Sequence, residues 1–128
     1  MNARKTEEYY RNLGPDAVCG CVYCRNYVRN IRRAYPVLCG FLARCGIDAE
    51  KPLETMPLEP REGYITYIGT QYVVLGSAGG FRETAAGGVG IAIAGSHPET
   101  ELGEEHFVLE LDETRLPWKE EGERRERS

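Results

Sequence analysis

The chain has 128 residues, of which 41% are hydrophobic and 28% are charged, and its formal net charge is −4. This length suits one domain with one core, and the composition excludes a fibrous or wholly disordered protein. The net charge argues against a protein whose whole surface coats nucleic acid. The charged N-terminus lacks the apolar run of a secretory signal, and no stretch approaches the roughly 18 apolar residues of a membrane span. We therefore expect a cytoplasmic protein without a membrane partner.

The first half of the sequence has the patterns of three helices. Residues 4–12 suit a short helix, which Gly14 and Pro15 would end. Apolar side chains then recur at intervals of three and four residues, first over 22–34 and again over 36–45, as on the buried face of a helix. Pro36 ends the first of these helices and begins the second. The expected core positions are Cys24, Tyr27, Val28 and Ile31, followed by Leu38, Phe41, Leu42 and Cys45.

The second half has the patterns of strands. Three prolines within residues 48–63 predict an extended surface connector. Residues 64–69 and 71–76 alternate in character, and the pair Gly69 and Thr70 between them predicts a tight hairpin. Two further candidate strands cover 89–94 and 104–113, and the latter should have one buried face and one largely polar face in water. The glycine-rich stretch between residues 76 and 90 is predicted to be a hairpin loop rather than a phosphate loop, because it joins two strands and no lysine follows it.

Helices that precede strands predict an α+β fold, with N-terminal helices packed on one face of an antiparallel sheet of about four strands. We expect a single domain over residues 1–118 and a charged, disordered tail over 119–128. The sequence contains eight tyrosines. Either they complete the core or, at a sheet edge, they form a homodimer surface, and the sequence leaves both open.

Three of the five cysteines lie within six residues, in the sequence Cys19-Gly-Cys21-Val-Tyr-Cys24, where a loop enters a helix. Thiolates are good zinc ligands, and a helix N-terminus favours negative charge, so Cys19, Cys21 and Cys24 are a candidate metal site with zinc as the cofactor. Packing is the alternative explanation for Cys24, because it lies on an expected core face. A fourth ligand would come from an acidic residue or from one of four other side chains: Cys39, Cys45, His97 and His106.

A reactive thiol is an alternative interpretation of the same loop. Cys19 or Cys21 lies near a helix N-terminus with Arg25 close by, an environment that lowers a thiol pKa. A thiol-dependent enzyme or redox sensor would also need a base, and the chain's two histidines, His97 and His106, lie far along the sequence. We therefore assign no catalytic residue.

A second alternative uses the arginines of the helix over 22–34. Arg25, Arg29 and Arg32 recur at intervals that place them on neighbouring parts of the helix surface, together with Arg33. Such a face can bind nucleic acid or an acidic partner. The plainer interpretation is a solvated helix face, and no nucleic-acid motif accompanies it.

Three short motifs are similar to those of a group of small bacterial proteins with no established activity. They are Cys19-Gly-Cys21-Val-Tyr-Cys24-Arg-Asn26, Gly46-Ile-Asp48-Ala-Glu-Lys-Pro52 and Leu116-Pro-Trp118. The resemblance extends over about residues 9–118 and implies a single bacterial domain without pointing to a reaction. Together these observations predict a non-enzymatic interaction or regulatory domain with a structural zinc at the cysteine loop.

Overall fold

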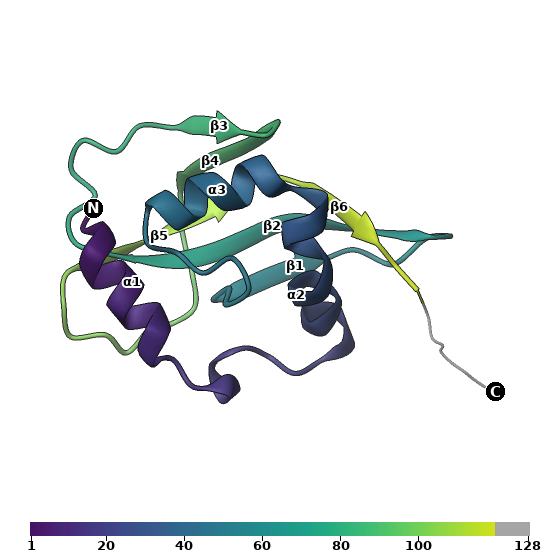
Figure 1. The fold of residues 1–128 in the computed structure, drawn as a ribbon, viewed down its shortest axis with the longest axis horizontal. Coiled ribbons are helices and arrows are strands. Elements are labelled where there is room, and N and C mark those ends of the chain that lie inside the picture. The colour runs from purple at the N-terminus through teal and green to yellow at the C-terminus, as the bar shows by residue number, and fades with distance from the viewer. Residues whose placement is uncertain (120–128) are drawn as a thin grey trace.

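The structure, a computed structural model, describes residues 1–119 (Figure 1). Within this range the helices come first: α1 (Ala3–Asn12), α2 (Val22–Ala34) and α3 (Pro36–Arg44). Six strands follow: β1 (Glu54–Pro57), β2 (Tyr64–Leu75), β3 (Thr84–Ala86), β4 (Val89–Ile93), β5 (His106–Leu111) and β6 (Thr114–Pro117). This order confirms the predicted α+β class, although the antiparallel sheet has more strands than the four expected. Beyond residue 119, the predicted tail lies outside the described residues.

The long strand β2 is the centre of the sheet. The strand order is β1-β2-β5-β4-β3, and β6 also pairs with β2. Along one side of β2, β5 pairs with its residues 70–75 and β6 with its residues 64–67. The opposite side pairs with β1 only near the middle of β2. The last residues of β2 therefore have no strand on that side.

The predicted hairpin at Gly69 and Thr70 is wrong, because both residues lie within the continuous strand β2. Thr55 of β1 pairs with Thr70 of β2, and Pro57 of β1 pairs with Tyr67 of β2. The step between these pairs is two residues along β1 and three residues along β2. One extra residue on one strand is a β-bulge, which shifts the alternation of side chains between the two faces. The break in the alternating pattern near Gly69 suggests a turn in the sequence. In the structure it corresponds to a bulge within the continuous strand β2.

The predicted connector and the predicted glycine-rich loop each contain a short strand. Residues 48–63 include β1, whose Pro57 is tolerated because β1 is an edge strand. The glycine-rich stretch includes β3 and a two-residue turn at Gly87 and Gly88, which joins β3 to β4. Both glycines have positive φ, 58° and 82°, as tight hairpin turns require. The stretch joins strands, as predicted, but it is not a hairpin loop between β2 and β4, because β5 lies between these two strands in the sheet.

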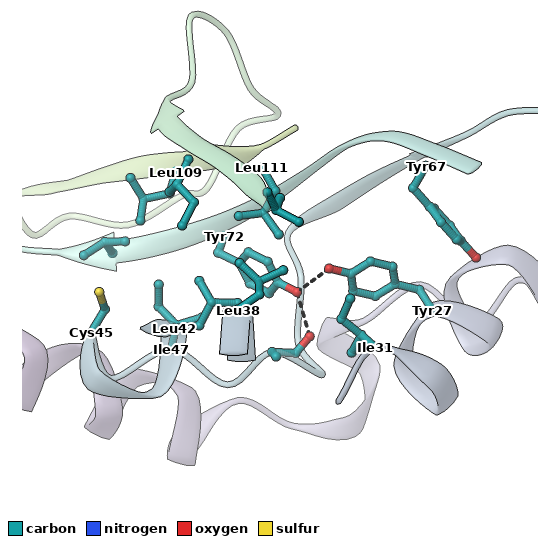
Figure 2. Packing of buried hydrophobic residues seen from close by; sticks show 14 of the residues in the cluster. Tyr27, Ile31, Leu38, Leu42, Cys45, Ile47, Tyr67, Tyr72, Leu109 and Leu111 are labelled. Atoms are coloured by element: carbon teal, nitrogen blue, oxygen red, sulfur yellow. Dashed lines mark hydrogen bonds between the residues drawn. The ribbon is translucent and has the colours of Figure 1, made fainter. Parts of the chain in front are cut away.

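The main core lies between the sheet and the helices α2 and α3 (Figure 2). Buried tyrosines take part in it, which confirms that tyrosines complete the core; the homodimer stays a prediction. Two positions expected in the core, Val28 and Phe41, are only partly buried. The buried residues labelled in Figure 2 are Tyr27, Ile31, Leu38, Leu42, Cys45, Ile47, Tyr67, Tyr72, Leu109 and Leu111.

A smaller apolar cluster lies on the opposite face of the sheet. It contains Val73, Leu75 and Val108, and partly buried side chains from the loop between β4 and β5 pack against it. The expectation that this face of β5 lies in water is therefore wrong for Val108, which is 1% exposed. The same loop engages His106, whose Nε2 lies 2.7 Å from the hydroxyl of Thr100.

Helix α1 covers the side of β2 that β1 leaves open. The N–H of Asn2 donates to the carbonyl of Leu75 at 2.8 Å, and the N–H of Leu75 donates to Oγ1 of Thr6 at 3.0 Å. The hydroxyl of Tyr10 donates to the carbonyl of Val73 at 2.7 Å. A helix thus supplies the hydrogen bonds that a neighbouring strand would supply, so these buried backbone groups are satisfied.

Replacing Thr6 by valine tests this arrangement. Valine keeps the shape of threonine but cannot accept the hydrogen bond from Leu75, and residue 6 is fully buried. An unsatisfied buried N–H costs about 1–3 kcal/mol, so we expect Thr6→Val to lower the free energy of unfolding by about that amount in urea titrations. The control Thr6→Ser keeps the hydroxyl and should lose less. Equal stability of Thr6→Val and the wild type would contradict the assigned bond.

Candidate metal centre

The structure brings the three predicted cysteines together. They lie between a short 3₁₀ turn (Pro15–Ala17) and the first turn of α2. The sulfur atoms of Cys19, Cys21 and Cys24 all lie within 4.8 Å of one another, and no other group of three or more Cys, His, Asp or Glu side chains within residues 1–119 meets this condition. All three are free thiols. This group can hold a metal ion.

Each thiol is positioned by a different part of the fold. Cys21 is the N-cap of α2, and its sulfur accepts the N–H of Cys24 at 3.5 Å. Cys24 lies on the buried face of α2, is 8% exposed, and contacts Oγ1 of Thr55 on β1 through its sulfur at 3.3 Å. Cys19 and Cys21 are exposed. The loop, the helix and the edge strand therefore meet at the three sulfur atoms.

The thiols differ in acidity. Burial raises the pKa of Cys24 to about 12, although the hydrogen bond with Thr55 offsets part of this effect. Burial also acts to raise the pKa of Cys21, but hydrogen bonds from the N–H of Cys24 and from the thiols of Cys19 and Cys24 outweigh it, so this pKa lies below its usual value. Because metal-bound cysteine is a thiolate, binding a metal here would release protons.

A cavity of about 180 Å³ adjoins the cysteines, and the segment around β1 forms its other wall. The carboxylate-bearing residue of this wall is Glu54. The four other candidates for a fourth ligand do not join the cysteine group. The sulfur of Cys39 lies 3.8 Å from the carbonyl of Ile31, and Cys45 is buried in the main core. Both histidines have partners in the loop between β4 and β5: His97 contacts the carbonyl of Pro98, and His106 contacts Thr100 and the carbonyl of Glu104.

The three sequence motifs meet around α2. Asn26 donates its side-chain N–H to the carbonyl of Pro117 at 3.0 Å, and the ring of Trp118 stacks on that of Tyr23 at 5.7 Å between centroids. Pro52, from the second motif, lines the cysteine cavity. Segments about ninety residues apart in the sequence therefore support the same helix terminus.

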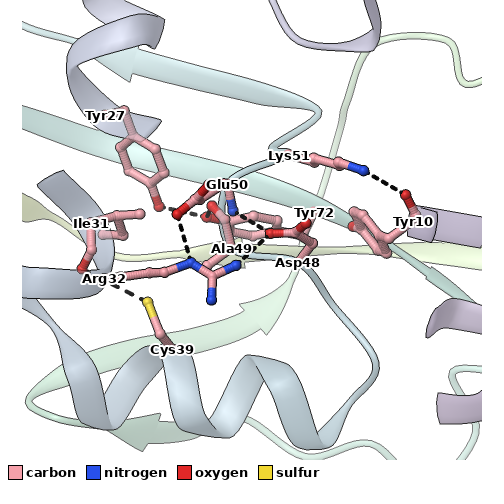
Figure 3. A network of polar contacts seen from close by, with 10 residues as sticks. All are labelled: Tyr10, Tyr27, Ile31, Arg32, Cys39, Asp48, Ala49, Glu50, Lys51 and Tyr72. Atoms are coloured by element: carbon pink, nitrogen blue, oxygen red, sulfur yellow. Dashed lines mark hydrogen bonds and ion pairs between the residues drawn. The ribbon is translucent and has the colours of Figure 1, made fainter. Parts of the chain in front are cut away.

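The predicted arginine face is divided by the fold. Arg32 forms two ion pairs, with Asp48 at 2.8 Å and with Glu50 at 2.7 Å (Figure 3). Arg25 donates to the carbonyl of Gly20. Arg29 forms no ion pair within the described residues. The three arginines therefore do not form one continuous free surface, because Arg32 is used to hold the turn after α3.

No protein-family model, curated protein or solved structure matches the chain. The resemblance through the three motifs therefore stays a prediction, and the function has to be inferred from geometry. None of the helices among residues 1–119 is long and apolar enough to cross a membrane.

Proposed function

We propose that Cys19, Cys21 and Cys24 bind one zinc ion, and that the protein is a non-enzymatic interaction or regulatory domain of the cytoplasm that this ion stabilises. The observation that carries the proposal is the distance of at most 4.8 Å between the three sulfur atoms. Zinc–sulfur bonds of about 2.3 Å in a tetrahedral site place sulfur atoms about 3.8 Å apart. Since two of the cysteines lie in an exposed loop, a small movement closes this difference.

Glu54 is the proposed fourth ligand, because it lines the same cavity as the three cysteines. Its carboxylate lies outside the group of atoms within 4.8 Å of one another, so its exposed side chain would turn toward the sulfur atoms to bind the ion. Zinc at this position ties the loop before α2 to β1, which Cys24 already contacts through Thr55. A structural role is favoured because sulfur-rich tetrahedral sites stabilise folds in many small domains. The site also lacks a histidine base in its lining, as far as the described residues go.

Zinc content and stability together test the proposal. Protein purified without chelators is expected to contain one zinc per chain by elemental analysis, and Cys21→Ser should lose it. The matched control is Cys39→Ser, outside the cysteine group, which should retain the metal. At a free zinc concentration a hundredfold above Kd, bound metal adds about 2.7 kcal/mol to the free energy of unfolding. A chelator should therefore lower the Tm of the wild type but not that of Cys21→Ser.

Metal-free wild-type protein with the same Tm in zinc and in chelator would contradict the proposal. In that case the rate of thiol alkylation tests the alternative function, a reactive thiol. A thiol-dependent enzyme or redox sensor requires Cys19 or Cys21 to react much faster than free cysteine near neutral pH. Slow alkylation of all five thiols would exclude that alternative as well.

A further inference from the structure

A second, larger cavity of about 500 Å³ also adjoins the cysteine loop. We call it the α2 groove. It is bounded by three segments that are distant in sequence: the loop over residues 14–20, one face of α2, and the turn over residues 48–51. A volume of this size is in the range of small-molecule sites. It shares Val18 and Cys19 with the cysteine cavity, and its other lining residues belong to different parts of the loop, of α2 and of the segment that follows α3.

Three cationic side chains line the α2 groove: Arg25, Arg29 and Lys51. Arg25 donates to the carbonyl of Gly20, and the ammonium of Lys51 donates to the carbonyl of Tyr10 at 2.7 Å (Figure 3). A backbone carbonyl orients a cation without neutralising it. Arg29 has no carboxylate partner within residues 1–119. The groove therefore contains positive charge that the described part of the fold leaves unneutralised.

The carboxylates of the groove are already engaged. Asp48 and Glu50 both pair with Arg32, at 2.8 Å and 2.7 Å, and Asp48 also accepts the N–H of Glu50 at 2.9 Å. The groove residues and Arg32 together comprise four cations and two carboxylates, a local charge of +2 on a chain whose formal charge is −4. A ligand that enters the groove thus meets a positive site on an acidic protein.

Apolar side chains complete the lining. Val28 on α2 and Val18 on the loop are each partly buried, and Pro15 lies beside them. The helical periodicity predicts Val28 in the core, but the structure leaves it half-buried at the groove. Binding sites for small organic molecules combine apolar walls with a few polar groups that fix orientation, and this lining has both.

We propose that the α2 groove binds a small organic anion, with a carboxylate or phosphate group held by Arg29, Arg25 and Lys51 and an apolar body against Val18 and Val28. Guanidinium groups suit this role because their planar set of N–H donors matches the oxygens of carboxylate and phosphate. Anion binding here does not require zinc, because none of the three cationic side chains is a proposed zinc ligand.

Titration of the full chain with model anions tests the proposal. Benzoate and phenyl phosphate are added to ¹⁵N-labelled protein, with benzyl alcohol as the neutral analogue, and amide shifts are followed by NMR. We expect saturable shifts centred on residues 14–20, 25–29 and 48–51 for at least one anion, with weaker binding of the alcohol. The stronger of the two anions identifies the head group.

A pair of charge-matched variants separates a site from general attraction. The double variant Arg29→Gln and Lys51→Gln should weaken anion binding at least about tenfold, the effect of losing a charge-assisted hydrogen bond. The double variant Arg33→Gln and Arg44→Gln removes the same charge from exposed positions outside the groove and should leave the affinity unchanged. Equal loss in both doubles would overturn the proposal. So would the absence of saturation by either anion, or tight binding of oligonucleotides alone.

Discussion

Above pH 10 the protein is expected to lose about 5 kcal/mol of unfolding free energy per pH unit. Four tyrosines cause this loss: Tyr10 is 3% exposed, and Tyr27, Tyr67 and Tyr72 are fully buried. Burial raises the pKa of Tyr67 to about 12 and raises the pKa of each of the other three further above the usual value of 10. The folded protein therefore holds all four hydroxyls in their neutral form.

The sign of the effect follows from the direction of these shifts. A group whose pKa is higher in the folded state contributes its full stability below the unfolded value, here near 10, and loses it as the pH rises through the folded value. Each of the four hydroxyls contributes about 1.4 kcal/mol per pH unit between pH 10 and 12. Above about 12 the contribution of Tyr67 is exhausted, and the other three continue.

Hydrogen bonds explain why these hydroxyls cannot ionise in place. The hydroxyl of Tyr27 lies 2.7 Å from that of Tyr72, which donates to the carbonyl of Ala49 at 2.7 Å. A tyrosinate at Tyr72 would place a negative charge against that carbonyl in the core, without water. Ionisation of these residues therefore requires the core to open.

Near-ultraviolet absorbance of tyrosinate, recorded with far-ultraviolet circular dichroism against pH, measures this coupling. Half of the eight tyrosines should ionise in the same transition in which helix and sheet signals disappear. Tyr64→Phe, which removes a hydroxyl outside the buried set, should leave the steepness of that transition unchanged. Ionisation of the four buried tyrosines near pH 10 with an intact circular dichroism spectrum would show that their hydroxyls reach water.

Gly46→Ala is expected to lower the free energy of unfolding by about 2–5 kcal/mol. Gly46 ends the turn after α3 with φ +83°, a conformation that costs a residue with a Cβ about 1–2 kcal/mol. A Cβ here would overlap the carbonyl oxygen of Ala3 and lie 2.8 Å from the nitrogen of Glu7. Overpacking against backbone adds about 1–3 kcal/mol. The added methyl group would therefore push α1 off the turn.

Gly63→Ala is the matched control for this prediction. Gly63 has the same φ of +83°, but nothing lies within 4 Å of the position of its Cβ. It should show only the conformational cost, so the difference between the two variants in urea unfolding measures the contact with α1. Faster hydrogen exchange at the amide of Leu75 in Gly46→Ala would locate the damage at the edge of β2. Equal losses in the two variants would contradict the contact.

The helices could be predicted because their signals are local. Spacing of apolar side chains in α2, and Pro36 and Gly46 at the ends of α3, depend on residues within one or two turns. The strands depended on more distant partners. The bulge between Tyr67 and Thr70 and the burial of Val108 depend on the segments that pack across the sheet, and an alternating pattern in one strand contains no information on these segments.

The candidate metal site likewise has one part that local sequence predicts and another part that depends on distant segments. The three thiols follow from spacing alone, since six residues entering a helix cannot separate them far. Their contact with Thr55, and the cavity shared with Glu54, depend on where β1 docks, and no sequence pattern connects these segments. The ion pairs of Arg32 with Asp48 and Glu50 were missed for that reason, and they reduce the predicted arginine face to the two residues that line the α2 groove.

The position of α1 against β2 has a consequence for how the chain is made. An uncovered strand edge is a template on which a second chain can add, and the last residues of β2 would present one without the helix. Because α1 precedes β2 by about sixty residues, it leaves the ribosome first and is available when its docking edge appears. We therefore expect α1 to cover this edge during synthesis, before a strand from another chain can pair with β2 and start aggregation.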